Sequence, residues 1–184
     1  MSIPVASKIM VIRHAEKPNS LDGGVSPTGV RDKSSLSVKG WQRAGALAVL
    51  FSPPGIAAQP ALAAPRFLFA SVVSSQRPVQ TLLPLSRKLN LSVTGGRRGE
   101  EKALLDQASS CDGPVLISWQ REQIPDLAKL LLKGSPDEGR HPMFWPQDRF
   151  DLTWVFDLQA GIYRFQQVPQ CLLGGDSDSP IQKL

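Results

Sequence analysis

The chain has 184 residues and a formal net charge of +5, and this length favours a single domain spanning residues 1–184. With 41% hydrophobic and 20% charged residues, the composition is that of an ordinary soluble protein. No apolar run reaches the roughly 18 residues of a membrane span. Arg13 also ends the first apolar run before it could form a signal peptide. We therefore expect a cytoplasmic protein with no membrane partner.

The basic residues are scattered apart from short clusters at Arg31/Lys33 and Arg97-Arg98. Because no aromatic residues alternate with them, we expect no nucleic-acid partner, whereas an anionic small substrate is consistent with the charge. Two cysteines are too few for a disulfide framework and match no zinc spacing. No residue set indicates a metal site or a nucleotide-binding loop, so we expect no cofactor. The sequence does not predict the oligomeric state.

In chain order, the first predicted element is a buried parallel strand over the short β-branched run 8–12. Residues 17–35 contain Pro, Gly, Ser and Asp without any period, which predicts a long loop, and such loops are often functional. A helix is predicted to open within residues 36–44, with Ser37 as its N-cap.

A second buried strand is predicted over 67–70, followed by a helix whose apolar side chains extend to Leu89. Pro84 lies inside this helical pattern and predicts a kink or an early break. Residues 94–98 are polar and contain glycine, which predicts a loop, and residues 100–108 predict a further helix.

The third buried strand is predicted at 115–118, and a strong helix follows at 124–132. Two β-rich runs, 153–158 and 162–168, predict an antiparallel hairpin. The resulting order β-α-β-α-α-β-α-β-β predicts an α/β fold. Its central sheet would be mostly parallel, with helices on both faces and the C-terminal hairpin at the sheet edge.

All three predicted parallel strands end in polar clusters, at residues 13–18, 74–77 and 118–122. In open α/β sheets, ligands bind beyond the carboxyl ends of the strands. Arg13 and Arg77 could each present a planar fork to two phosphate oxygens. A neutral His14 between guanidinium groups would be a capable nucleophile on phosphorus, because neighbouring cations lower the pKa of an imidazole.

Four segments resemble motifs of the histidine phosphatase (phosphoglycerate-mutase-like) superfamily, in the order that the family has them. They are Arg13-His14-Ala15, Leu36-Ser37-x-x-Gly40-x-x-Arg43-Ala44, Ser74-Ser75-x-Arg77-x-x-Gln80-Thr81, and VLISWQREQIPDL at 115–127. The resemblance spans residues 8–175. It implies a single phosphoglycerate-mutase-like domain in which His14 is phosphorylated while Arg13 and Arg77 hold the phosphoryl oxygens.

The general acid is less well defined by this resemblance. In the phosphoglycerate-mutase branch it is a glutamate between the second helix and the third strand, which implies Glu100 or Glu101 here. Acidic residues are also favoured in the first turn of a helix, which would explain the same two positions without catalysis. Glu16 and Asp22 are weaker candidates.

One motif departs from the family. Trp119 and Ile124-Pro125 fix the alignment of the third strand end, and this places Arg121 where the resemblance implies a second catalytic histidine. His141 lies in a Pro/Gly-containing loop outside the motif, and we expect it at the surface. An arginine cannot become neutral, so Arg121 would bind phosphate firmly and could slow its release.

Two functions remain open at this point. One is a metal-independent phosphomonoester hydrolase that acts through a phosphohistidine on His14 and is impaired by Arg121. The alternative is a non-catalytic module that binds a phosphate ester or a phosphoprotein through Arg13, Arg77 and Arg121. Both predict a phosphorylated small molecule or a phosphoprotein as partner, and inorganic phosphate or sulfate in the pocket. A mutase is disfavoured because the chain is short and contains no segment resembling a longer substrate insert.

Overall fold

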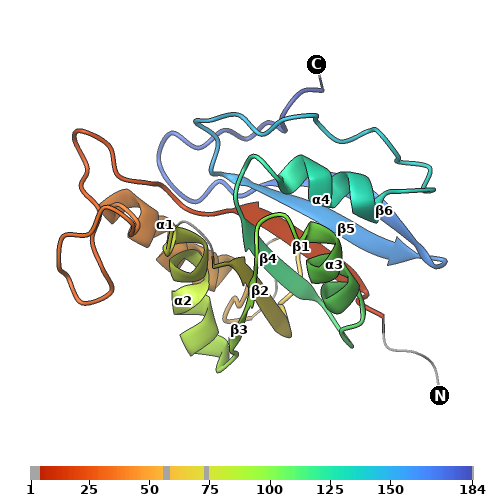
Figure 1. Cartoon of the computed structure of the whole chain (residues 1–184), viewed down its shortest axis with the longest axis horizontal. Coiled ribbons are helices and arrows are strands. Elements are labelled where there is room, and N and C mark those ends of the chain that lie inside the picture. The colour runs from red at the N-terminus through yellow and green to blue at the C-terminus, as the bar shows by residue number, and fades with distance from the viewer. Residues whose placement is uncertain (1–4, 56–58, 73–74, 184) are drawn as a thin grey trace.

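A computed structural model describes residues 5–55, 59–72 and 75–183 of the chain (Figure 1). Six strands form one sheet in the order β3-β2-β4-β1-β5-β6. The strands are β1 (Lys8–Arg13), β2 (Phe67–Ser71), β3 (Val93–Gly96), β4 (Val115–Trp119), β5 (Leu152–Gln159) and β6 (Ile162–Pro169). The helices are α1 (Val38–Leu50), α2 (Arg77–Leu89), α3 (Glu101–Ser109) and α4 (Ile124–Leu131).

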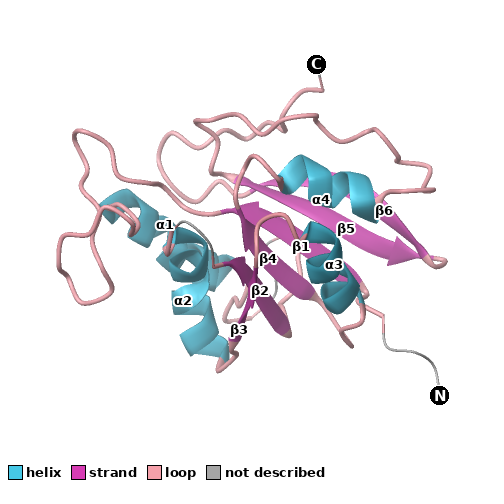
Figure 2. Cartoon of the chain, viewed as in Figure 1, coloured by secondary structure: helices cyan, strands magenta, loops and turns pink. Residues whose placement is uncertain are grey.

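The sheet is parallel across β3, β2, β4 and β1, and antiparallel where β5 joins β1 and β6 joins β5. Ala160 and Gly161 both have positive φ, at 49° and 82°, which suits the tight turn of the β5–β6 hairpin. These observations confirm the predicted fold class, a mostly parallel sheet with a hairpin at its edge (Figure 2).

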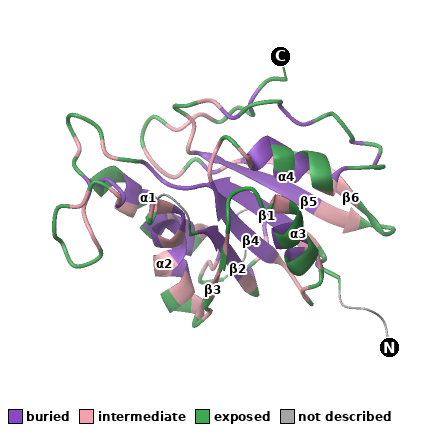
Figure 3. Ribbon diagram, viewed as in Figure 1, coloured by how far each residue is buried: buried purple, intermediate pink, exposed green. Residues whose placement is uncertain are grey.

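Alternate side chains of the strands build two cores, one on each face of the sheet. One core joins Ile9, Val11, Ile117 and Trp154 to apolar residues of α3 and α4. The other joins Met10, Ile12, Leu116 and Val155 to apolar residues of α1 and α2. This period of two, with both faces covered, explains why the central strands are almost continuously apolar and buried (Figure 3).

The connections place a crevice at the carboxyl ends of the two central strands, β1 and β4. β1 leads to α1 on one face, whereas its neighbour β4 leads to α4 on the opposite face (Figure 1). Neighbouring parallel strands whose chains depart to opposite faces form the usual ligand-binding position of an open α/β sheet. The crevice therefore lies beyond Arg13 and Trp119, which are register partners at the ends of these two strands.

One strand was not predicted. Residues 94–98 were expected to be a loop, but β3 spans Val93–Gly96 and pairs with β2 at the edge of the sheet. A Cβ at Gly96 would lie 2.9 Å from a side-chain carbon of Leu104 and 3.0 Å from one of Trp119. A glycine is needed there because the strand approaches buried side chains closely, so the second half of the strand, Gly95-Gly96, lacks the usual β-branched signal.

Of the kink or early break expected at Pro84, the early break does not occur: α2 continues to Leu89, with the buried Leu82 and Leu85 holding it against the sheet on either side of the proline. The expected surface position of His141 was wrong. His141 is not a surface residue, since only 3% of it is exposed and its ring packs 6.2 Å from that of Trp154. Within the described ranges, no helix is long and apolar enough to cross a membrane.

Candidate active site

A small polar cavity of about 140 Å³ lies at the carboxyl ends of β1 and β4. It is lined by Arg13, His14, Lys17, Ser75, Arg77, Gln120, Arg121 and Glu122. The structure thus brings together His14 and the three arginines that the sequence singled out. Four of the lining side chains are cationic and one is a carboxylate, so the cavity suits an anion.

His14 has a defined tautomer in this cavity. Its Nδ1 lies 2.7 Å from the carbonyl oxygen of Ala15, and since a carbonyl can only accept, Nδ1 carries the proton. The lone pair of the neutral ring is therefore on Nε2. Burial lowers the pKa of His14 from 6.5 to about 4; the Ala15 bond opposes this shift, whereas Arg13 and Arg77 add to it. The ring is consequently neutral at physiological pH.

Arg13 is fixed by contacts from a distant part of the chain. Its Nη1 donates to three backbone carbonyl groups within residues 146–149, at 2.7 to 3.2 Å. The ring of Phe150 lies against the guanidinium, 3.7 Å from Cζ to the ring centroid. Burial, and then Arg121, lower the pKa of Arg13 to about 10, so it remains charged. The buried Nε has no hydrogen-bond partner among the described residues, as expected for a donor reserved for a ligand.

Arg77 begins α2 and reaches the cavity from the other side of the crevice. Its Nη1 makes long hydrogen bonds to the carbonyls of Lys33 and Ser34, at 3.4 and 3.5 Å. Its Nε is also buried and unpartnered within the described part of the chain. Thr81 links this arginine to the segment after His14, since its hydroxyl donates to Arg77 O and accepts from Ala15 N, both at 2.8 Å. Ser74 of the same motif lies outside the described residues.

Arg121 lines the cavity and is paired with its own neighbour. Its Nε lies 2.9 Å from Oε1 of Glu122, and its Nη1 donates over 3.4 Å to the carbonyl of Trp145. About a third of the Arg121 side chain is exposed, at 32%. The position implied for a second histidine therefore carries a partly neutralised guanidinium.

The other motif residues position the cavity without lining it. Gln80 accepts from Leu36 N at 2.9 Å and donates to Ser35 Oγ at 2.8 Å, which joins α2 to the end of the long loop. Arg43 binds both carboxylate oxygens of Glu16, at 2.9 to 3.1 Å, and also pairs with Asp176. Glu16 is thus occupied by this buried ion pair.

Other predicted carboxylates lie elsewhere. Glu100 and Glu101 are at the start of α3, outside the lining of the cavity, and Glu101 accepts from Gly99 N. Asp22 accepts from the backbone N–H groups of Val38 and Lys39 at the start of α1.

Sequence reasoning did not assign roles to three residues that shape the cavity: Lys17, Glu122 and Phe150. Lys17 and Glu122 could have been found, because each lies in a polar cluster at a strand end. Phe150 carries no such signal, since it is remote in sequence from β1. Among the described residues, no three His, Cys, Asp or Glu side chains form a group that could hold a metal ion.

Comparison with known proteins gives no match to any family model or to any curated protein sequence. Solved structures do match. The mycobacterial glucosyl-3-phosphoglycerate phosphatase has a TM-score of 0.57 at 13% identity, covering 89% of this chain and 98% of that chain. The α-ribazole phosphatase from Shigella flexneri has a TM-score of 0.56 at 14% identity, covering 92% and 100%.

A third match is SixA from Agrobacterium tumefaciens, a candidate phosphohistidine phosphatase, with a TM-score of 0.51 at 17% identity, covering 86% of this chain and 94% of that one. These members of the histidine phosphatase superfamily match most of the chain, as the sequence motifs predicted. The chain has their phosphoglycerate-mutase-like fold. At such identities the likeness concerns the fold.

Proposed function

We propose that the protein is a metal-independent phosphomonoester hydrolase that acts through a phosphohistidine on His14. The observation that carries this proposal is the neutral His14 ring, with its lone pair on Nε2, in a cavity lined by Arg13, Arg77 and Arg121. The mycobacterial phosphatase of the same fold has been solved with VO3 and with inorganic phosphate, which supports an oxyanion as the ligand here.

In the proposed reaction, Nε2 of His14 attacks phosphorus and the P–O bond to the alcohol breaks. The arginines stabilise the charge on the three equatorial oxygens of the transferred group, and their positions are fixed before the substrate arrives. Water then attacks the phosphohistidine, which releases phosphate and restores the neutral ring. Nδ1 keeps its proton throughout, because it donates that proton in a hydrogen bond to the carbonyl of Ala15.

The leaving alcohol needs a proton from an acid. The resemblance offers Glu100 or Glu101, whereas the cavity itself offers Glu122. Oε1 of Glu122 lies 2.9 Å from Nε of Arg121, at the wall of this cavity. We propose that Glu122 donates this proton, because among the described residues it is the carboxylate that lines the cavity.

The alternative function is a binding module, and Arg121 is the observation that favours it. A third guanidinium stabilises a bound dianion as much as the transition state, and such uniform binding lowers KM without raising kcat. Turnover of phosphomonoesters in chelator by the parent, His14→Ala and Arg121→His proteins separates the two functions.

We expect no turnover by His14→Ala. For Arg121→His we expect kcat to rise and inhibition by phosphate to weaken, each by about tenfold, the effect of roughly 1.4 kcal/mol. Activity that survives the loss of His14 would refute the mechanism. If neither the parent nor Arg121→His hydrolyses any ester while both bind phosphate, the protein is a binding module.

A further inference from the structure

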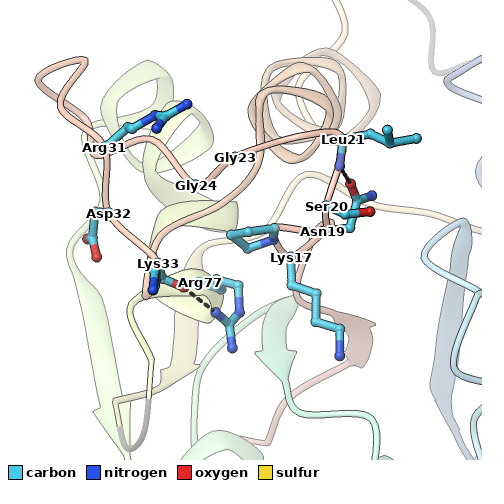
Figure 4. A pocket seen from close by; sticks show the side chains of 11 residues that line it. Lys17, Asn19, Ser20, Leu21, Gly23, Gly24, Arg31, Asp32, Lys33 and Arg77 are labelled. Carbon is cyan, nitrogen blue, oxygen red and sulfur yellow. Dashed lines mark hydrogen bonds between the residues drawn. The ribbon is translucent and has the colours of Figure 1, made fainter.

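A groove of about 720 Å³ adjoins the cavity that contains His14. Lys17 and Arg77 line both hollows, so the two spaces meet at these side chains. The remaining walls come from the long loop, residues 18–21 and 23–24 on one side and 31–33 on the other. Figure 4 shows the side chains of Lys17 and Arg77 pointing in the same direction, whereas that of Arg31 starts from the opposite arm of the loop and points a different way.

The groove has an excess of positive charge. Four of its eleven lining residues are cationic, namely Lys17, Arg31, Lys33 and Arg77. None of the four forms a salt bridge with a carboxylate of the described residues.

Asp32 is the carboxylate in this lining, and it is occupied by its own neighbours. Its oxygens accept from the backbone and hydroxyl of Ser34 and from the hydroxyl of Ser35, at 2.6 to 3.0 Å. The bond from Ser35, and then those from Ser34, lower the pKa of Asp32. The carboxylate therefore holds a turn of the loop. Its charge also acts on Arg77, whereas Arg31 and Lys33 remain available to a ligand.

Hydrogen bonds hold the groove in shape. Val25 N donates to Leu36 O at 2.8 Å, and Asp32 N donates to Gly24 O at 2.9 Å. The indole of Trp41, in α1, donates to Val25 O at 2.7 Å. Because these bonds are already made, a ligand would order little more than the side chains it touches, which lowers the cost of binding.

We propose that this groove binds a second anionic group of the substrate, on its alcohol part, through Arg31 and Lys33. The substrate class is then a phosphomonoester whose leaving group carries a further phosphate or a carboxylate. This inference rests on the proposed function, since it takes the cavity of His14 as the place of the scissile phosphoryl group. Lys17 and Arg77, at the junction, would face both anions.

The test compares butane-1,4-diol monophosphate, butane-1,4-diol bisphosphate and the ω-carboxyalkyl phosphate of similar length. In the parent we expect kcat/KM for the bisphosphate, the carboxyalkyl phosphate or both to exceed that for the monophosphate by about tenfold. This is the effect of one or two charge-assisted hydrogen bonds to the second anionic group. The bisphosphate and the carboxylate arms show which anion the groove prefers. In Arg31→Ala/Lys33→Ala this ratio should fall toward one.

The matched control is Lys129→Ala/Lys133→Ala, which removes the same charge from residues outside the groove and should keep the ratio of the parent. A parent that shows no preference for a second anion would overturn the inference, as would an equal loss of preference in the control. Calorimetry with butylphosphonate and butane-1,4-bisphosphonate gives the same comparison without turnover. The protein could also bind the bisphosphonate more tightly, in a way that depends on Arg31 and Lys33, and hydrolyse nothing. That result would support the proposed anion site in the groove and contradict the proposed hydrolase activity.

Discussion

His14 owes its character to one backbone atom and to burial. The carbonyl of Ala15 fixes the proton on Nδ1, and the surroundings disfavour a second proton on the ring. The Arg13 guanidinium is instead held in place by three backbone carbonyls and by the ring of Phe150. His14 is thereby kept neutral while Arg13 is kept charged, and the proposed phosphoryl transfer to His14 needs both.

The titration of His14 tests this account directly. Its pKa is lowered from 6.5 to about 4 in the folded protein, so the ring should stay neutral as the pH falls and gain its proton only near pH 4. The chain has two histidines, so NMR of the imidazole carbon-bound protons needs only a His14→Ala spectrum for assignment. A midpoint at or above 6.5 would show that burial and the arginines do not act as described.

The general acid can be identified from the leaving group. An acid matters most when the departing alcohol is a poor leaving group, so its loss should lower kcat/KM more for an alkyl phosphate than for p-nitrophenyl phosphate. We expect this difference, of about 10² or more, in Glu122→Gln. Glu100→Gln and Glu101→Gln are matched controls from the start of α3. If one of them shows the difference and Glu122→Gln does not, the acid comes from α3.

At the scale of elements, the long loop and α1 are built around close contacts with the segment after β1. Ser37 N donates to Glu16 O at 3.0 Å, and the hydroxyl of Ser37 accepts from Gly40 N to cap the helix. Gly40 then passes so near the chain that a Cβ there would lie 2.5 Å from Glu16 O. The predicted N-cap is confirmed. The close approach to Glu16 also explains why the same motif has a glycine at position 40.

Gly40→Ala should therefore destabilise the protein, by about 1–3 kcal/mol, because backbone atoms must move to admit the methyl group. The same helix contains an ideal comparison in Gly45, which is exposed and has nothing within 4 Å of the position of its Cβ. Gly45→Ala should stabilise by roughly 0.5–1 kcal/mol through helix propensity alone. Urea unfolding of both variants measures the two free energies. A Gly40→Ala protein as stable as the parent would contradict the close contact.

The elements that sequence predicted well are those whose side chains alternate between two cores, such as β1 and β4. Periodicity could not identify β3, because Gly95 and Gly96 carry no apolar side chain and are selected by close approach. The residues of the candidate site also divide into those that the sequence could predict and those that it could not. Arg13, His14, Arg77 and Arg121 follow strand ends and could be predicted to converge, whereas the backbone carbonyls that hold Arg13 have no signature in residue type.

Across the whole molecule, part of the positive charge behind the net +5 is concentrated around the cavity and the groove. The cavity and the groove together are lined by six of the 21 lysines and arginines, namely Arg13, Lys17, Arg31, Lys33, Arg77 and Arg121. Concentrated charge of one sign in a concave surface raises the local concentration of anions and speeds their capture. The basic composition, which by itself was compatible with several partners, is thus consistent with a small anionic ligand.

Binding of phosphate should consequently stabilise the folded state as a whole. A ligand that binds only the folded protein adds about 2.7 kcal/mol at 100 times its dissociation constant, so phosphate or vanadate should raise the Tm relative to chloride at matched ionic strength. Arg77→Ala should lose most of that increase, because Arg77 brings to the cavity a buried Nε that has no partner among the described residues. Arg87→Ala removes the same charge from an exposed position near the end of the same helix and should keep the increase. Differential scanning calorimetry of the three proteins, with and without phosphate, decides the matter. An equal increase in the parent and in Arg77→Ala would place the anion outside this cavity.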